Sequence, residues 1–372
     1  MKVLVTTNRA EFAQMDGVTA IRVGMFTEPE GRAFLHETTG LPDGEDARAV
    51  GAELGWLPLG LAQAGTYIAR GKHSHRRYLE LLERQPLDEA LRRQAGAQHA
   101  GVLAATALSM AAVADADPSG DAARLLSVLS VLSPDGVSRR LLVKGASGLG
   151  LAGGVLAALE VLSGWSLVTL SGRVAEQDRV VVSVHRLTAR IVRLYGQQPG
   201  STVPAGAAAD AAVQWLEELS ADLPLSQVGM RRSDVEELAL HVQAVRDCIT
   251  GEPSEELMWQ AAWAGRALTA AGDLEHAVSL LVTNVADQVR VLGEDHPGTL
   301  LSRSSLASAY WAAGRVAEAI TLYEQTLADR VRVLGSDHPH TLGCRNNLAH
   351  AYEAEGRVED SASLLRDTRE PE

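Results

Sequence analysis

The chain has 372 residues, of which 34 are basic and 47 acidic, so its formal net charge is −13. Such an acidic balance disfavours a broad surface that would contact nucleic-acid phosphates. The length predicts several domains at about 100–200 residues each, and the aromatic content of 4% beside abundant small residues predicts a mainly α protein.

The first predicted element is a short strand at the beginning of the sequence. Residues 3–5 form an apolar run, and the polar residues 6–9 follow at once. This pattern is typical of a central parallel strand whose polar end faces a ligand crevice. No phosphate-binding loop precedes the run in the sequence. We therefore expect the edge of an incomplete nucleotide-binding sheet, with an exposed apolar strand.

The next predicted segment is helical and contains "LGWLPLGLAQAGTYI" at 54–68. A proline after an apolar run can simply kink a helix, and for Pro58 taken alone this structural explanation suffices. The overlapping stretch "GTYIARGKH" (65–73) is the nearest approach to the phosphate-binding pattern GxxxxGK[ST]. It has one residue too many between its glycines and His73 in the Ser/Thr position. His73 and His75 are expected at the surface.

Residues 98–196 are predicted to form helices, then a small β-hairpin, then a last helix. The strands "WSLVTL" (165–170) and "RVVVSV" (179–184) flank a polar turn, and "HRLTARIVRLYG" follows them. Helices followed by a β-hairpin are the outline of a winged helix. His185 lies at the end of the second strand, where a structural histidine is the simplest explanation.

Three of these stretches together resemble an NB-ARC or STAND-type nucleotide switch. "VLVTTN" resembles the sensor strand of that family, 54–68 its GLPL motif, and "VVVSVHRLTARIVR" (180–193) its MHD motif, in the family's order. The resemblance implies that Arg9 approaches the terminal phosphate, that Pro58 packs against adenine, and that His185 contacts the β-phosphate of ADP. The family's Thr-Thr-Arg is Thr-Thr-Asn-Arg here, which displaces Arg9 by one position.

ATP hydrolysis would require parts that the sequence lacks. It contains no GxxxxGK[ST] loop and no strand that ends in paired acids to hold a metal ion. We therefore expect no enzymatic activity and no cofactor bound by this chain alone, whereas ADP or ATP is implied for full-length relatives.

Two alternative functions come from residues 139–200. "GLGLAGG" satisfies GxGxxG through Gly148, Gly150 and Gly153, with "RLLV" before it, as in a dinucleotide-binding enzyme. No second βαβ unit follows, and the simpler explanation is a glycine-rich loop. The other alternative is a DNA-binding regulator, because five arginines lie around the expected hairpin: Arg173, Arg179, Arg186, Arg190 and Arg193.

The C-terminal part contains an internal repeat with a period of 42 residues. The copy beginning "VLGEDHP" at 291 recurs as "VLGSDHP" at 333, and a degenerate copy lies at 271–281. Each copy holds two amphipathic segments split by a glycine, which predicts a helix hairpin. In the "Asp-His-Pro" connector we expect Asp295 and Asp337 to cap the helices that follow. Residues 200–256 are predicted to be a helical spacer that is broken by prolines and abuts the solenoid, and atypical hairpins within it are left open.

The repeats resemble tetratricopeptide repeats, in the long 42-residue variant of kinesin light chains. The resemblance covers roughly 257–368 and implies a solenoid in which the first helix of each hairpin lines a concave ligand groove. A peptide or a helix of a partner protein is the expected ligand. The residues expected to face the groove are Ser304, Ser308 and Trp311 in one copy and Asn346, His350 and Glu353 in the next.

The sequence thus predicts a regulatory protein that binds other proteins through its repeats. No disulfide or zinc site is expected from Cys248 and Cys344, and no signal peptide or membrane span is recognised, so a cytoplasmic protein is expected. Oligomerisation is left open. The expected parts are a nucleotide-domain remnant (1–45), a helical GLPL-type domain (46–97), a winged helix (98–196), a helical spacer (197–256) and tetratricopeptide repeats (257–372).

Overall fold

The computed structural model describes residues 25–84, 100–172, 180–198, 205–249 and 251–366. Two compact units, residues 1–109 and 110–372, divide inside helix α6 (Ala100–Ala116). Each unit has hydrophobic core residues of its own. The strand expected at 3–5 and the predicted site residue Arg9 lie outside the described residues.

The first unit consists of short helices around one small core. Its elements are α1 (Glu28–Thr39), α2 (Glu45–Glu53), α3 (Pro58–Gly71), α4 (His75–Arg84) and the first part of α6. A capping box starts α1, because the backbone N–H of Thr27 donates to the Glu30 carboxylate at 2.8 Å. Leu35 of α1 packs with Val50 and Leu61. Helix α1 therefore shares a core with the helices that follow residue 45.

The turn before α3 is built around Trp56. The indole ring lies over Gly31 and Gly51, where an added Cβ would lie 2.5 and 2.0 Å from ring atoms. Pro58 is the first residue of α3, where a missing N–H costs nothing. His75, expected at the surface, is instead buried at 5% exposure, and burial lowers the pKa of its imidazole.

The second unit begins with a small mixed module that covers residues 121–196. A three-stranded antiparallel sheet has the strand order β1-β3-β2, with Val137 and Leu170 on either side of Val182. The hairpin expected at 165–170 and 179–184 is present in shorter form as β2 and β3, and β1 was not expected. The elements are α7 (Asp121–Val131), β1 (Val137–Ser138), α8 (Arg139–Lys144), α9 (Val155–Gly164), β2 (Thr169–Ser171), β3 (Val181–Ser183) and α10 (Arg186–Gly196).

The glycine-rich loop between α8 and α9 contradicts the dinucleotide-binding alternative. "RLLV", which that alternative requires as a strand, is helical within α8. A Cβ at Gly148 would lie 2.9 Å from the Cα of Trp215, and Gly150 has a φ of +60°. The N–H of Gly153 donates to the Asp121 carboxylate at 2.6 Å. These glycines serve a close helix approach and a turn.

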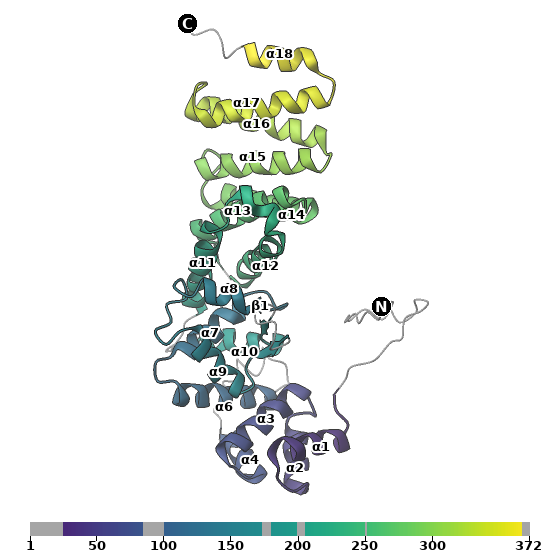
Figure 1. The fold of residues 1–372 in the computed structure, drawn as a ribbon, viewed down its shortest axis with the longest axis vertical. Helices are drawn as coiled ribbons and strands as arrows, with labels where there is room; N and C mark the ends of the chain where they lie inside the picture. Colours follow the sequence, from purple (N-terminus) through teal and green to yellow (C-terminus); the bar gives the residue numbers. More distant parts are fainter. Residues whose placement is uncertain (1–24, 85–99, 173–179, 199–204, 250, 367–372) are drawn as a thin grey trace, which may run out of the picture. The chain divides into compact units, whose positions relative to one another are not determined.

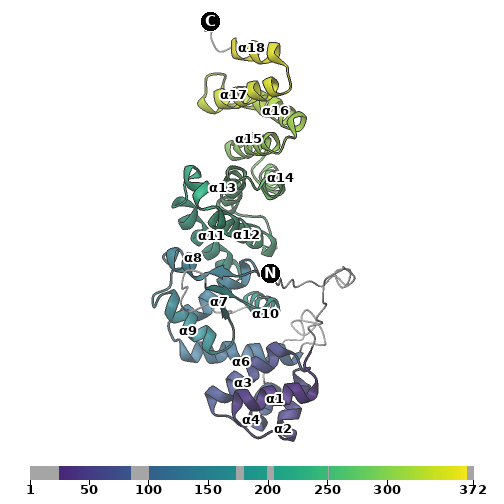
Figure 2. The ribbon, with the colours of Figure 1, turned by 45° about the vertical axis from the view of Figure 1, so that its right-hand side comes forward.

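Four helical hairpins follow, stacked one on the next (Figures 1 and 2). The first hairpin falls in the predicted spacer 197–256, because α11 and α12 pack on each other and on α13 as the later hairpins do. The elements are α11 (Ala205–Ala221), the 3-10 helix η4 (Leu225–Met230), α12 (Arg232–Cys248), α13 (Glu255–Ala271), α14 (Leu274–Val291), α15 (Pro297–Ala312), α16 (Val316–Leu334), α17 (Pro339–Ala354) and α18 (Val358–Arg366).

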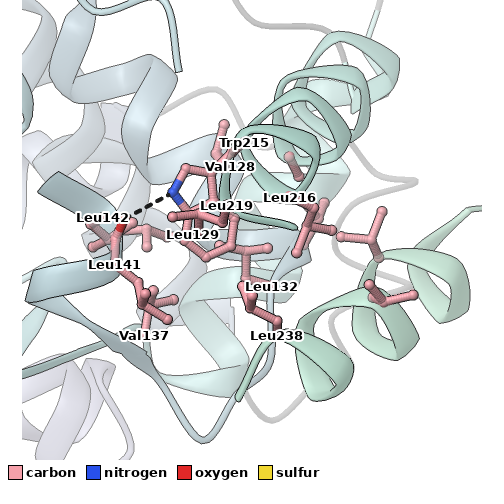
Figure 3. Packing of buried hydrophobic residues seen from close by; sticks show 14 of the residues in the cluster. Val128, Leu129, Leu132, Val137, Leu141, Leu142, Trp215, Leu216, Leu219 and Leu238 are labelled. Carbon is pink, nitrogen blue, oxygen red and sulfur yellow. Dashed lines mark hydrogen bonds between the residues drawn. The ribbon is translucent and has the colours of Figure 1, made fainter. Parts of the chain in front are cut away.

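Trp215 of α11 joins the mixed module to the hairpins. Its side chain is fully buried, and its indole N–H donates to the carbonyl of Leu141 at 3.3 Å (Figure 3). A Cβ at Gly145 would lie 2.5 Å from the indole, so the glycine is what lets α8 approach. One continuous core then runs from α7 through Trp215 to α15. The module and the first hairpins are therefore a single packed body.

Truncation of Trp215 is expected to destabilise this body. Trp215→Ala should lower the free energy of unfolding by about 3–5 kcal/mol, because it removes a large buried side chain and leaves a cavity. Urea denaturation followed by far-ultraviolet circular dichroism measures the change. Trp311→Ala is the matched control, since Trp311 is 47% exposed, and it should cost under about 1 kcal/mol. Equal losses in the two variants would contradict the assigned packing.

A buried polar network reinforces the same junction. The Glu237 carboxylate of α12 accepts the N–H of Ser138 at 2.6 Å, and His241 Nδ1 accepts the N–H of Ser133 at 3.1 Å. Burial alone would raise the pKa of the Glu237 carboxyl, but the His241 imidazole, whose Nε2 lies 3.7 Å from the carboxylate, and the N–H of Ser138 outweigh it and hold that pKa below its usual value. The charged carboxylate is therefore favoured in the folded protein.

Glu237 should make stability depend on pH. Because its folded-state pKa is depressed, its contribution is present above the usual carboxyl pKa and is lost as the pH falls through the folded-state value. Glu237→Gln should lower the free energy of unfolding by about 1 kcal/mol near neutral pH and by progressively less in acid. Denaturation curves over a pH series test this. Glu236→Gln, at an exposed ion pair with Arg232, is the control, and a constant difference at every pH would refute the assignment.

Candidate protein-interaction face

The turn within each hairpin repeats the same contacts. Gly314 and Gly356 have φ of +75° and +83°, a conformation that favours glycine. The guanidinium of Arg315 lies 4.2 Å from the ring centroid of Tyr310, and that of Arg357 lies 4.1 Å from Tyr352. This cation–π contact explains why the Tyr, Gly and Arg positions recur with the 42-residue period. The hairpins consequently present equivalent positions at equivalent places.

The caps of α15 and α17 differ from the sequence prediction. The N-cap residues are His296 and His338, whose Nδ1 atoms accept the N–H of Gly298 and His340, each at 3.2 Å. Asp295 instead accepts a hydrogen bond from Arg332 at 2.7 Å, and that bond lowers the pKa of its carboxyl. The predicted aspartate caps at 295 and 337 are therefore both wrong, because in each case the imidazole one residue later accepts the N–H group.

A buried arginine connects the last two repeats. Arg330 of α16 is 4% exposed and donates to the carbonyls of Leu300 at 3.0 Å and His340 at 2.5 Å. These carbonyls belong to α15 and α17, so one guanidinium links the first helices of neighbouring hairpins. The described residues provide no carboxylate partner for it.

Removal of this link should loosen the solenoid. Arg330→Ala is expected to lower the free energy of unfolding by about 2–3 kcal/mol, because it removes two charge-assisted hydrogen bonds and leaves a cavity. Arg332→Ala, two residues further along the helix at an exposed ion pair, should cost under about 1 kcal/mol. Thermal or urea melts compare the two. A smaller loss for Arg330→Ala than for its neighbour would refute the role.

The non-buried sides of α13, α15 and α17 form the candidate face, named here the A-helix face. Helix α13 packs against α15, and α15 against α17. Positions one period apart correspond: the set 304, 308 and 311 on α15 matches 346, 350 and 353 on α17, and 262, 266 and 269 on α13. All six residues predicted to face the groove lie on α15 and α17 and are half-buried or exposed.

The two predicted serines are bonded within the repeats. Ser308 Oγ donates to the carbonyl of Ser304 at 3.0 Å and lies 2.6 Å from the hydroxyl of Tyr323. Ser304 Oγ lies 3.9 Å from the sulfur of the buried Cys344. Their hydroxyls therefore connect α15 to α16 and α17, and Trp311 is the large exposed side chain of this trio.

The three residues predicted on α17 are exposed. No hydrogen bond is assigned to the Asn346 side chain within the described part of the chain. His350 Nδ1 lies 3.5 Å from the Glu353 carboxylate, which also accepts the hydroxyl of Ser361 at 3.1 Å. This end of the A-helix face offers an open amide and one carboxylate.

Helix α13 contributes residues to the face that the sequence reasoning missed. Trp259 and Arg266 occupy the positions that correspond to 301 and 308, and Trp263 lies between them on the same side of the helix. The signal was available in the period, since counting 42 residues back from Ser308 gives Arg266. The degenerate first copy concealed it, because its conserved core is recognisable only at 271–281.

The residues predicted to hold a nucleotide belong to different parts of the structure. Pro58 starts α3 in the first unit, and His185 caps α10 in the second, where its Nδ1 accepts the N–H of Leu187 at 3.2 Å. Burial, and then the charge of Arg186, lower the pKa of the His185 imidazole. Each residue therefore has a local structural role.

The basic cluster proposed around the hairpin is only partly described. Arg186 is exposed at the start of α10, whereas Arg193 donates to the carbonyl of Ser130 and so supports the module. Arg173 and Arg179 lie outside the described residues.

The described ranges hold no group of three or more His, Cys, Asp or Glu side chains placed to bind a metal ion. None of the helices in those ranges combines the length and the apolar character that a membrane crossing needs.

Comparison with known proteins assigns the repeats. Residues 264–298 and 299–340 match the family model described as tetratricopeptide repeat. The prediction of tetratricopeptide repeats is thereby confirmed for these residues, and such repeats mediate protein–protein interaction. The chain matches none of the curated proteins with which it was compared.

Two solved structures with related repeats are similar to part of the chain. One is from Podosopora anserina and is described as a kinesin light chain with nearly identical TPR-like repeats. It is 29% identical over 49% of this chain and 82% of its own, with a TM-score of 0.36. A variant of that protein is 29% identical over 48% and 89%, with a TM-score of 0.34. The TM-scores are low, and the assignment of the repeats comes from the family model.

Proposed function

We propose that the chain is a protein-recognition module that binds an extended segment or a helix of a partner along the A-helix face. The observation that carries the proposal is the recurrence of non-buried side chains at two sets of corresponding positions of α13, α15 and α17, namely 266, 308 and 350, and 269, 311 and 353. Tetratricopeptide hairpins stack their first helices side by side, which produces an elongated surface suited to a peptide. Trp311 and Asn346 offer an apolar and an amide contact on it.

We further propose that residues 121–196 are a winged helix derived from a STAND-type switch. The order helix, strand, helix, helix, strand, strand and the sheet order β1-β3-β2 support this proposal. The nucleotide site is proposed to be incomplete, since the sequence contains no GxxxxGK[ST] loop to wrap a triphosphate. Arg9, Pro58 and His185 remain the residues through which a longer relative would contact ADP.

The composition of α9 argues against reading DNA with this winged helix. In helix-turn-helix proteins the second helix enters the major groove and contacts base edges through polar and basic side chains. The exposed residues of α9 are instead Leu156, Ala157 and Glu160. These side chains offer the duplex no cation, and the Glu160 carboxylate would be repelled by its phosphates, so a protein contact is the better proposal for this module.

A peptide selection tests the binding function. Peptides selected from a random phage-displayed library on the immobilised 372-residue chain should bind in fluorescence anisotropy, and Trp311→Ala and Asn346→Ala should each weaken binding at least about fivefold. Gln325→Ala, which changes an exposed amide on α16 outside the face, should leave affinity unchanged. A library that yields no binder, or binders indifferent to both face variants, would overturn the proposal.

A further inference from the structure

The exposed side of α13 has an unusual composition. Trp259, Trp263 and Arg266 follow one another at i, i+4 and i+7, so they share one side of the helix. Buried residues such as Leu257, Ala261, Ala264 and Leu268 occupy the other sides. Two indoles and a guanidinium therefore lie at the α13 end of the A-helix face.

Arg266 has no counter-charge in the described part of the chain. Its side chain is half-buried, and its Nε donates only to the carbonyl of Ala262, at 3.4 Å. Burial lowers the pKa of its guanidinium, and no carboxylate contributes to that shift. A partly desolvated cation without a partner is costly. Arg303 on α15, by contrast, has the Asp329 carboxylate at 3.0 Å.

The two tryptophans flank the cation with apolar surface. Trp259 is 38% exposed, and its indole N–H donates to the Glu255 carboxylate at 3.3 Å. Trp263 is half-buried and packs against the core on one side. Trp and Arg are the residue types most enriched where protein interfaces gain their affinity, because they combine large contact area with hydrogen bonding.

The charge of this site defines the group that it would take. One guanidinium matches the single charge of a carboxylate and can bind it through two parallel hydrogen bonds. No second cation lies on this side of α13, whereas a phosphate dianion would call for more positive charge. Glu255, one turn before Trp259, would repel an acid there and so restrict the carboxylate to the Arg266 end.

We infer that Arg266 is the acid-binding anchor of the A-helix face, and that it binds an Asp or Glu side chain of the partner while a neighbouring apolar side chain of the partner lies on Trp259 and Trp263. This inference rests on the proposed binding function. It gives the chemistry of the partner segment, which is an acidic residue next to an apolar one. It also places the contact on α13, away from the α17 end.

The test uses peptides selected on the full chain from a random phage-displayed library. The selected sequences should carry an acidic residue beside an aromatic or aliphatic one. Arg266→Gln should weaken their binding at least about tenfold, and so should replacement of the peptide acid by its amide. Because both changes remove the same contact, their combination should cost little more than either alone. Arg232→Gln, an exposed arginine on α12, should have no effect.

Two further variants separate a binding role from a folding role. Arg266→Lys keeps the positive charge but loses the paired N–H donors of the guanidinium, so it should weaken binding less than Arg266→Gln. No variant should melt below the wild-type temperature, and Arg266→Gln should melt at or above it, because it removes the unpaired, partly desolvated cation. Three outcomes would each overturn the anchor. The selected peptides could lack an acidic residue, or the effects of the two combined changes could be additive. Arg266-dependent binding could also become tighter when phosphoserine replaces the peptide acid. Binders that depend on Trp311 and Asn346 but not on Arg266 would overturn the anchor alone, and a library without binders would overturn the binding function too.

Discussion

The close packing of Trp215 against α8 is the contact on which the second unit depends. Gly145 and Gly148 have no side chain, so the indole and the backbone of α11 can approach the loop after α8, and the indole N–H then reaches the carbonyl of Leu141. Any larger residue at either glycine would meet Trp215 within 3 Å. The first hairpin is thereby held on the mixed module, and every later hairpin stacks on the one before it.

The binding face follows from this anchoring. Helix α13 packs on α11, α12 and η4, so the side chains of Trp259 and Arg266 are presented by a helix whose neighbours are fixed at the module. At the other end, Arg330 ties α15 to α17 through two carbonyls. A face with rigid ends loses little conformational entropy when a partner binds, which favours affinity for short segments.

The sequence predicted the later hairpins well because each depends on local, periodic contacts such as Tyr310 with Arg315. The helices α11 and α12 fall in the predicted spacer, where the sequence leaves atypical hairpins open; their pairing could not be assigned from the sequence, since it lacks the period and depends on long-range packing of Trp215. The GxGxxG pattern misled because a turn and a tight helix contact require the same glycines as a phosphate loop. Of the site, the exposed positions on α15 and α17 were predictable from the repeat. The hydrogen bond between Ser308 and Tyr323, and the lack of a counter-charge for Arg266 among the described residues, depend on how the helices pack, so only the fold reveals them.

The most direct test of the account is hydrogen exchange on a Gly148→Val variant of the full chain. A Cβ there meets the backbone of α11, so the junction must open. The account predicts that amides in α7, α8, α11, α12 and α13 lose protection together, because they belong to one core. Loss of protection confined to the loop at 145–154, with α11 to α13 as protected as in the wild type, would show that the hairpins do not depend on the Trp215 contact.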